Sequence, residues 1–190
     1  VIFEYDPVTN IYTKKIDLVN STAIGSAPFG SLIQVSTGKI YGMTSNGGNS
    51  GGGVIFNYVI SSNTYTKKID LNTSNGGYPN GHLIQANNGL LYGLATVGGT
   101  NNVGVLFEYD KNTNTYTKKI DMLSTNGITP YGSLLQASNS KLYGLTSAGG
   151  TSGLGTLFEY DISLNTYTKR VDFTGNAGAN PGSVPYGSLV

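Results

Sequence analysis

Acidic side chains and a single histidine are the residues with which this sequence could carry out acid–base or metal chemistry. A catalytic group is needed at one particular place, whereas a structural residue in a repeated sequence recurs with the repeat. The Asp that follows several of the Glu-Tyr pairs begins a turn, where its carboxylate can accept backbone N–H bonds. We therefore interpret the acids as structural. All ten recur at matching positions, as Glu4, Glu108 and Glu159, as Asp6, Asp110 and Asp161, and as Asp17, Asp70, Asp121 and Asp172.

The histidine, His82, stands where the other units have Ser31, Ser133 and Ser188. A histidine acting as a general base needs a nucleophile and an orienting acid, and the sequence singles out neither. A metal site would need several His, Asp or Glu ligands. We interpret His82 as a polar substitution on an inner strand, and we expect no catalytic residue, no metal site and no cofactor.

Basic residues stand mostly in pairs in the last segment of each unit. These pairs could form a basic rim that binds an acidic glycan. The favoured interpretation is protection of an outermost strand, because Lys on an open strand edge deters association with other chains. Eight of the eleven basic residues are in the pairs Lys14-Lys15, Lys67-Lys68, Lys118-Lys119 and Lys169-Arg170.

A repeat of about 51 residues positions all these side chains. The segment TYTKKID occurs at 64–70 and 115–121, with variants at 11–17 and 166–172, and its Tyr recurs at intervals of 53, 51 and 51 residues. Each unit has four short segments rich in β-branched or aromatic residues with period-two alternation, which predicts strands. In the third unit these segments are 133–137, 141–147, 156–161 and 166–172. No window shows the apolar spacing of a helix.

Four strands in a unit of this length are typical of a β-propeller blade. We therefore predict an all-β fold of tandem four-stranded blades at 30–70, 81–121 and 132–172. Residues 1–17 are expected to be the two outer strands of an earlier blade, and 187–190 the start of a later one. Because propellers typically have about 4–8 blades, this number of units predicts a partial ring or an open stack.

Two known repeat families resemble this pattern. Kelch repeats carry a Gly-Gly doublet, then a Tyr, then a Trp seven residues later, as Gly149-Gly150, Tyr160 and Tyr167 do here with Tyr in place of Trp. The sequence is more similar to GloVer-type tandem repeats of secreted bacterial proteins, in motifs such as GTLFEYD, TYT and PYGSLLQASNSKLYGLTSAGG. That resemblance covers nearly the whole chain. It implies an exported protein, extracellular or at the surface of a bacterium, and names no activity.

Composition excludes several classes of function. The formal net charge is +1, so the sequence carries no basic footprint for nucleic acid. No apolar run approaches the roughly 18 residues of a membrane span. The chain has no cysteine, which excludes disulfides and thiolate metal sites.

The connection between the last strand of one unit and the first strand of the next varies in length. The interval from the TYT tyrosine to the following Gly-Ser or Gly-His is 18, 16, 16 and 20 residues. Functional variation concentrates in loops on a rigid scaffold, and exposed aromatics there could stack on sugars or on a partner's side chains. The alternative is that these aromatics fill the gap between blades. The candidate ligand-binding residues are Phe29, Asn80, His82, Tyr131 and Tyr186.

The expected function is therefore a non-enzymatic scaffold for protein binding or surface adhesion, with a protein or glycan partner at the loop face. The recurrence of the acids and the neutral, polar composition favour it. One alternative is a glycan-binding propeller that uses the loop aromatics. Another is an enzyme whose active site lies in blades outside this sequence, since propellers also host enzymes.

Overall fold

A computed structural model describes residues 1–36 and 38–190, and its regular elements are all β-strands. In this part of the chain no helix is long and apolar enough to cross a membrane. The strands form one hairpin and three four-stranded sheets. The hairpin consists of β1 (Ile2–Asp6) and β2 (Ile11–Ile16), and the first sheet consists of β3 (Ile33–Ser36), β4 (Lys39–Thr44), β5 (Val54–Val59) and β6 (Thr64–Asp70). The second sheet consists of β7 (Ile84–Gln85), β8 (Leu91–Ala95), β9 (Val105–Asp110) and β10 (Thr115–Asp121). The third sheet consists of β11 (Leu135–Gln136), β12 (Leu142–Thr146), β13 (Thr156–Asp161) and β14 (Thr166–Asp172).

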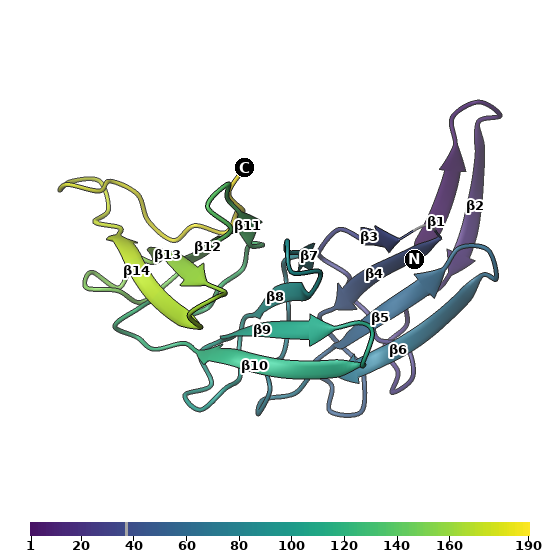
Figure 1. Ribbon diagram of the computed structural model, residues 1–190, viewed down its shortest axis with the longest axis horizontal. Helices are drawn as coiled ribbons and strands as arrows, with labels where there is room; N and C mark the ends of the chain where they lie inside the picture. Colours follow the sequence, from purple (N-terminus) through teal and green to yellow (C-terminus); the bar gives the residue numbers. More distant parts are fainter. Residues whose placement is uncertain (37) are drawn as a thin grey trace.

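Within each sheet, consecutive strands pair antiparallel in the order of the sequence. The three sheets follow one another along an open arc, with the β1–β2 hairpin projecting at one end and the segment after β14 at the other (Figure 1). The short first strands β3, β7 and β11 lie toward the concave side, and β6 and β10 lie on the outer side. The predicted all-β, propeller-like fold of tandem blades in an open arrangement is confirmed. The division of the chain into separate domains stays a prediction.

The last two strands of each unit form a hairpin that is closed by the same side chains each time. An Asn in the turn adopts a left-handed backbone, with φ between 52° and 59°, which Asn tolerates better than most residues. Its Oδ1 accepts a hydrogen bond from the Tyr five residues earlier, as Tyr109 OH to Asn114 at 2.8 Å. A Phe on one strand stacks on the Tyr of the next, as Phe107 does on Tyr116 with ring centroids 5.0 Å apart. The recurring sequence therefore specifies the outer hairpin locally.

The first strand of each unit is shorter than expected. The sequence predicted a strand over 133–137, but β11 covers only Leu135–Gln136, and β7 is equally short. The reason is that the residues just before the strand bond to the next unit instead of to their own sheet; the backbone N–H of Ser133, for example, donates to Ser188 Oγ at 2.8 Å. The third and fourth strands of that unit match the prediction at 156–161 and 166–172.

Buried aromatics join neighbouring sheets into a continuous core. Phe107 and Tyr109 of β9 are fully buried, and so are Phe158 and Tyr160 at the equivalent positions of β13. In the hairpin the equivalent residues Phe3 and Tyr5 are 56% and 52% exposed. Among the described residues β1 pairs only with β2, whereas β9 and β13 each pair with a strand on both sides.

The second glycine of each Gly-Gly doublet makes room for an aspartate. A Cβ on Gly99 would lie 2.2 Å from Asp121 Oδ1, and a Cβ on Gly150 would lie 2.3 Å from Asp172 Oδ1. The Asp121 carboxylate instead accepts the N–H of Thr100 at 3.0 Å and its hydroxyl at 2.8 Å. This contact fastens the end of the fourth strand to the loop between the second and third strands.

Candidate functional site

Four glycines stack along the concave side of the arc and bring the units into close contact. A Cβ on Gly30 would lie 2.2 Å from the Gly81 carbonyl oxygen, one on Gly81 would lie 2.4 Å from that of Gly132, and one on Gly132 would lie 2.2 Å from that of Gly187. Only glycine permits this backbone approach. We call these four glycines and the residue after each, Ser31, His82, Ser133 and Ser188, the inner rim. The rim fixes the spacing of the loops that precede it.

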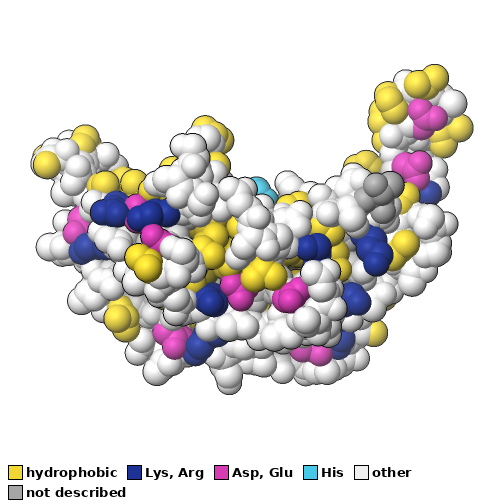
Figure 2. All heavy atoms as spheres, in the orientation of Figure 1, with side chains coloured by type: hydrophobic (Ala, Val, Ile, Leu, Met, Phe, Trp, Pro, Cys, Tyr) yellow, Lys and Arg dark blue, Asp and Glu magenta, His cyan; other side chains and the backbone are white. Residues whose placement is uncertain are grey.

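His82 has a partner on the inner rim that its sequence position did not reveal. Ser133 Oγ lies 2.7 Å from His82 Nδ1 and also accepts the backbone N–H of His82 at 2.8 Å. A hydroxyl oxygen has two lone pairs, so Ser133 Oγ can either donate its proton to Nδ1 or accept a second proton from it. Burial lowers the pKa of His82, which favours the neutral ring. In Figure 2 the histidine is visible on the concave edge.

The bond between the Ser133 side chain and the His82 backbone recurs along the inner rim. A triad needs an acid to orient the histidine, and Ser133 and His82 instead repeat the bond by which Ser133 N–H donates to Ser188 Oγ at 2.8 Å one unit later. No group of three or more His, Cys, Asp or Glu side chains that could hold a metal occurs among residues 1–36 and 38–190.

The residue before the Pro of each inter-unit loop adopts a left-handed backbone. Its φ is 56° at Ala27, 54° at Tyr78, 51° at Thr129 and 46° at Val184. This conformation is unfavourable for residues with a side chain, and especially for β-branched ones. It recurs because the N–H of the same residue bonds to the loop of a neighbouring strand pair, as Thr129 N to Val103 O at 2.8 Å. The strained position lies two residues before Phe29, Asn80, Tyr131 and Tyr186, which are four of the five predicted ligand-binding residues.

The predicted loop residues fall into two groups. Phe29 and Tyr186 are 68% and 63% exposed, and the rings of Tyr131 and Tyr186 lie 4.8 Å apart between centroids. Asn80 is instead held within its own unit, because its Nδ2 donates to Thr96 Oγ1 at 2.8 Å. The structure thus brings two predicted aromatics together, with Tyr186 exposed and Tyr131 half-buried, whereas Asn80 is committed to the fold. Ligand binding by these residues stays a prediction.

The inter-unit loops and the loops between second and third strands lie side by side. Isolated bridges join Ser26 to Asn46, Gly77 to Val97 and Ile128 to Ala148. Because antiparallel strands alternate in direction, the other two connections of each unit emerge at the opposite end of the sheet. The molecule therefore has two loop faces. We call the one with the inter-unit loops the rim face and the other the hairpin face.

Many of the acidic residues have the recurring structural roles that the sequence predicted. Asp6, Asp110 and Asp161 each accept the N–H of the residue two positions on, at 2.8, 2.8 and 3.0 Å. The first basic residue of each pair contacts the Asp three residues later, as Lys118 does Asp121 at 2.8 Å. Basic and acidic side chains consequently lie beside one another on the surface (Figure 2). An open basic rim for an acidic ligand does not fit this pairing.

Glu159 departs from the repeat despite its recurring position. Its side chain is only 7% exposed, and it contacts Arg170 and Lys141 at 2.7 Å each and accepts the Tyr143 hydroxyl at 2.7 Å. Arg170, then Lys141 and Tyr143, lower the pKa of Glu159 from its ordinary 4.5 to about 2. In the preceding unit Leu90 replaces Lys141 and Lys119 replaces Arg170, with Lys119 Nζ 3.8 Å from Glu108. An acidic residue that recurs in the sequence therefore has different neighbours in different units.

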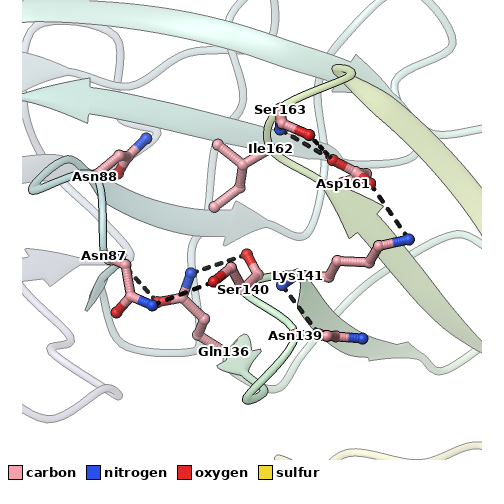
Figure 3. Close-up of a pocket in the computed structure, with 9 residues that line it drawn as sticks. All are labelled: Asn87, Asn88, Gln136, Asn139, Ser140, Lys141, Asp161, Ile162 and Ser163. Carbon is pink, nitrogen blue, oxygen red and sulfur yellow. Dashed lines mark hydrogen bonds and ion pairs between the residues drawn. The ribbon is translucent and has the colours of Figure 1, made fainter.

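Beside Glu159, on the hairpin face, lies a pocket of about 440 Å³ between the second and third sheets (Figure 3). We call it the amide pocket. Asn87 and Asn88 come from the β7–β8 turn, and Gln136 and Asn139 come from the end of β11 and the turn after it. Lys141 extends along one side toward Asp161, with Nζ 3.3 Å from Oδ2. The lining residues are Asn87, Asn88, Gln136, Asn139, Ser140, Lys141, Asp161, Ile162 and Ser163.

One substitution explains why this pocket is open. The matching depression between the first and second sheets has about 170 Å³ and is lined in part by Lys39 and Lys111. Lys111 reaches across its unit and donates to the Gly89 carbonyl at 2.6 Å. Ile162 occupies the equivalent position in the third unit and cannot make that bond. The Lys-to-Ile difference thus leaves space where the preceding unit is bridged.

Sequence comparison identifies the family. A model described as the Gloeobacter/Verrucomicrobia repeat matches residues 1–188. The chain belongs to this repeat family. Among curated proteins, none matches the sequence.

Solved structures similar to this Gloeobacter/Verrucomicrobia repeat chain support the fold. The extracellular domain of a proposed one-component system from B. thetaiotaomicron has a TM-score of 0.65 at 14% identity, over 97% of this chain and 22% of that one. TolB from Acinetobacter baumannii has a TM-score of 0.55 at 13% identity, over 91% and 37%. An oligogalacturonate lyase from Vibrio parahaemolyticus has a TM-score of 0.55 at 11% identity, over 88% and 45%. The chain thus spans less than half the length of each, and the likeness concerns the fold alone.

The amide pocket of this repeat protein was not predicted from the sequence, because the prediction relied on residues that recur between units. The signals were present as departures from the repeat. Lys111 stands where the first and third units have Ile60 and Ile162, and Arg170 replaces a lysine that occurs in the other three units. Searching for positions where one unit differs would have pointed to this junction.

Proposed function

We propose that this repeat chain is a non-catalytic scaffold of an exported bacterial protein, extracellular or at the cell surface, that binds a protein partner through its rim face. The observation that carries the proposal is the display of Phe29, Tyr131 and Tyr186 next to the rigid glycine stack, with Phe29 and Tyr186 more than half exposed. Aromatic side chains are enriched where proteins bind one another, since they offer a large contact area at low entropic cost.

Three further points support a scaffold. The family is a tandem repeat, and a structural neighbour is described as an extracellular domain. The described acids lie in turns, ion pairs and loop contacts of the fold. Ser133 and His82 bond as part of the inner rim and without an orienting acid.

The test measures binding by the full-length protein to an array of proteins secreted by the same bacterium and to a glycan array. We expect specific protein binding that is lost in Tyr131→Ala/Tyr186→Ala. A matched control is Leu164→Ala, which removes a side chain that is 70% exposed on the hairpin face and should leave binding unchanged. Binding to glycans only, with the same loss, would replace this proposal with a lectin function of the same aromatics.

Enzymatic turnover by the full-length protein would contradict the proposal. If the full-length protein hydrolyses or cleaves a glycoside or ester, and one substitution abolishes that turnover, the non-catalytic proposal is wrong. Equal loss of binding in the Tyr pair and in Leu164→Ala would also contradict it, because the rim face would then have no special role.

A further inference from the structure

We propose that the amide pocket binds a neutral saccharide. This inference is independent of the proposed scaffold function, since the pocket lies on the hairpin face and shares no residue with the rim face. Its volume of about 440 Å³ falls in the range of about 300–1,000 Å³ that is usual for small-ligand sites. It is bounded by turns from two different units, so the site exists only where both units are in place.

The amide side chains of the pocket are held in position before any ligand arrives. Asn139 Oδ1 accepts the N–H of Lys141 at 3.1 Å, and its Nδ2 donates to Tyr143 OH at 2.9 Å. Asn88 makes the same two bonds with Leu90 and Tyr92, at 3.1 and 2.9 Å. An amide nitrogen has two protons, and each of these bonds uses one of them. Two fixed amides therefore each retain a donor for a ligand at little further cost in conformational entropy.

Gln136 and Asn87 connect the two walls. Gln136 Oε1 accepts the backbone N–H of Asn87 at 2.9 Å, and Gln136 Nε2 donates to the Ser140 carbonyl at 3.0 Å. Asn87 Nδ2 points to Ser140 Oγ at 3.4 Å (Figure 3), a contact at the long limit that a ligand hydroxyl can replace. The Gln136 side chain thus joins the two walls of the pocket through backbone atoms of Asn87 and Ser140. The side chains of Asn87 and Ser140 stay available to bond a ligand.

The charges of the pocket favour a neutral ligand. Lys141 is the only basic lining residue and Asp161 the only acidic one, and they pair at 3.3 Å. Lys141 is held further by Glu159 at 2.7 Å. A charged ligand would have to break these pairs, whereas a polyhydroxyl ligand needs the amide and hydroxyl groups that line the pocket. Ile162 adds an apolar surface for the C–H face of a sugar ring.

The position of Ile162 also provides a selective test. Ile162→Lys introduces the residue that bridges the preceding unit at Lys111, so the variant should fold and close the pocket. Ile60→Lys makes the same change at the equivalent position of the first sheet, outside the amide pocket, and is the matched control. Asn87→Ala is a second variant, which removes a polar group and leaves its backbone bond to Gln136 intact.

The experiment is an NMR titration of the full chain with maltose, cellobiose and lactose, which reads the side-chain NH₂ signals of Asn87, Asn88, Gln136 and Asn139. We expect saturable shifts for at least one disaccharide with Kd on the order of 1 mM. Ile162→Lys and Asn87→Ala should each weaken binding about tenfold, and Ile60→Lys should not. Galacturonic acid tests the charge argument and should cause no such shifts.

Three results would overturn the proposal. The first is the absence of saturable shifts at these amides with every neutral disaccharide. The second is binding that Ile162→Lys and Asn87→Ala leave unchanged, which would place it elsewhere. The third is binding of galacturonic acid alone, which would mean that the pocket selects a charged ligand.

Discussion

Replacing Gly81 with alanine tests whether the glycine stack determines how the units pack. The new Cβ would lie 2.4 Å from the Gly132 carbonyl oxygen and 2.9 Å from Ser133 Oγ, against an ordinary contact distance of about 3.5–4.0 Å. The second and third units would have to move apart by about 1 Å at the inner rim. Because Gly81 does not have a left-handed backbone, the cost comes from this contact and not from φ.

Overpacking of this kind typically costs about 1–3 kcal/mol. With a urea m-value of about 2 kcal/mol/M, Gly81→Ala should lower the unfolding midpoint by about 0.5–1.5 M. The assay is urea unfolding followed by far-UV circular dichroism and by tyrosine fluorescence. The contact between Ser133 and His82 should also change, which the ring signals of His82 would report.

Gly187→Ala is the matched control for this variant. Gly187 is the repeat equivalent of Gly81, but a Cβ there would meet no atom within 4 Å. We expect its midpoint to stay within about 0.3 M of the unchanged chain, as for a surface substitution. If both variants lower the midpoint equally, the reasoning from the glycine stack is refuted.

Two further predictions concern charge and backbone strain. Because the folded-state pKa of Glu159 is lowered from 4.5 to about 2 by Arg170, Lys141 and Tyr143, its contribution to stability is present above pH 4.5 and lost as the pH falls toward 2. Acid unfolding should therefore be shallower over this window in Glu159→Gln, and identical acid profiles would contradict the ion-pair assignment. Val184→Gly relieves a left-handed β-branched residue, at φ 46°, and should stabilise by up to about 1 kcal/mol. Val8→Gly, at a position without positive φ, should not stabilise, and a thermal unfolding midpoint that moves equally in both would refute the strain argument.

The outer strands could be predicted from the sequence because their determinants are local. The TYT segment alternates, and the Asn before it forms the turn; β13 and β14 accordingly begin and end where the alternation does. The first strand could not be bounded in this way. The segment around Ser133 satisfies its backbone in the neighbouring unit, and no pattern within one unit reports a bond to another.

The candidate site likewise has features that could be predicted from the sequence and features that could not. The variable loops carry Phe29 and Tyr186, which are exposed in the structure, and their role in binding stays a prediction. The bond between His82 and Ser133 joins residues 51 positions apart, and it could be predicted only after knowing that units touch at the glycines. The amide pocket depends on Ile162 leaving a space, which is a property of packing and not of residue type.

The tyrosine of each TYT segment has a consequence for cutting the protein into modules. Tyr167 OH donates to the Asn126 carbonyl at 3.0 Å, and Tyr116 and Tyr65 make the same bond to Asn75 and Ile24, always to a residue 41 positions earlier. Each sheet is thus fastened to the loop that precedes it. The transplantable module begins at that loop, near residues 21, 72 and 123, and a designer who excised a unit at its first glycine would discard the acceptor of the tyrosine on its outer strand.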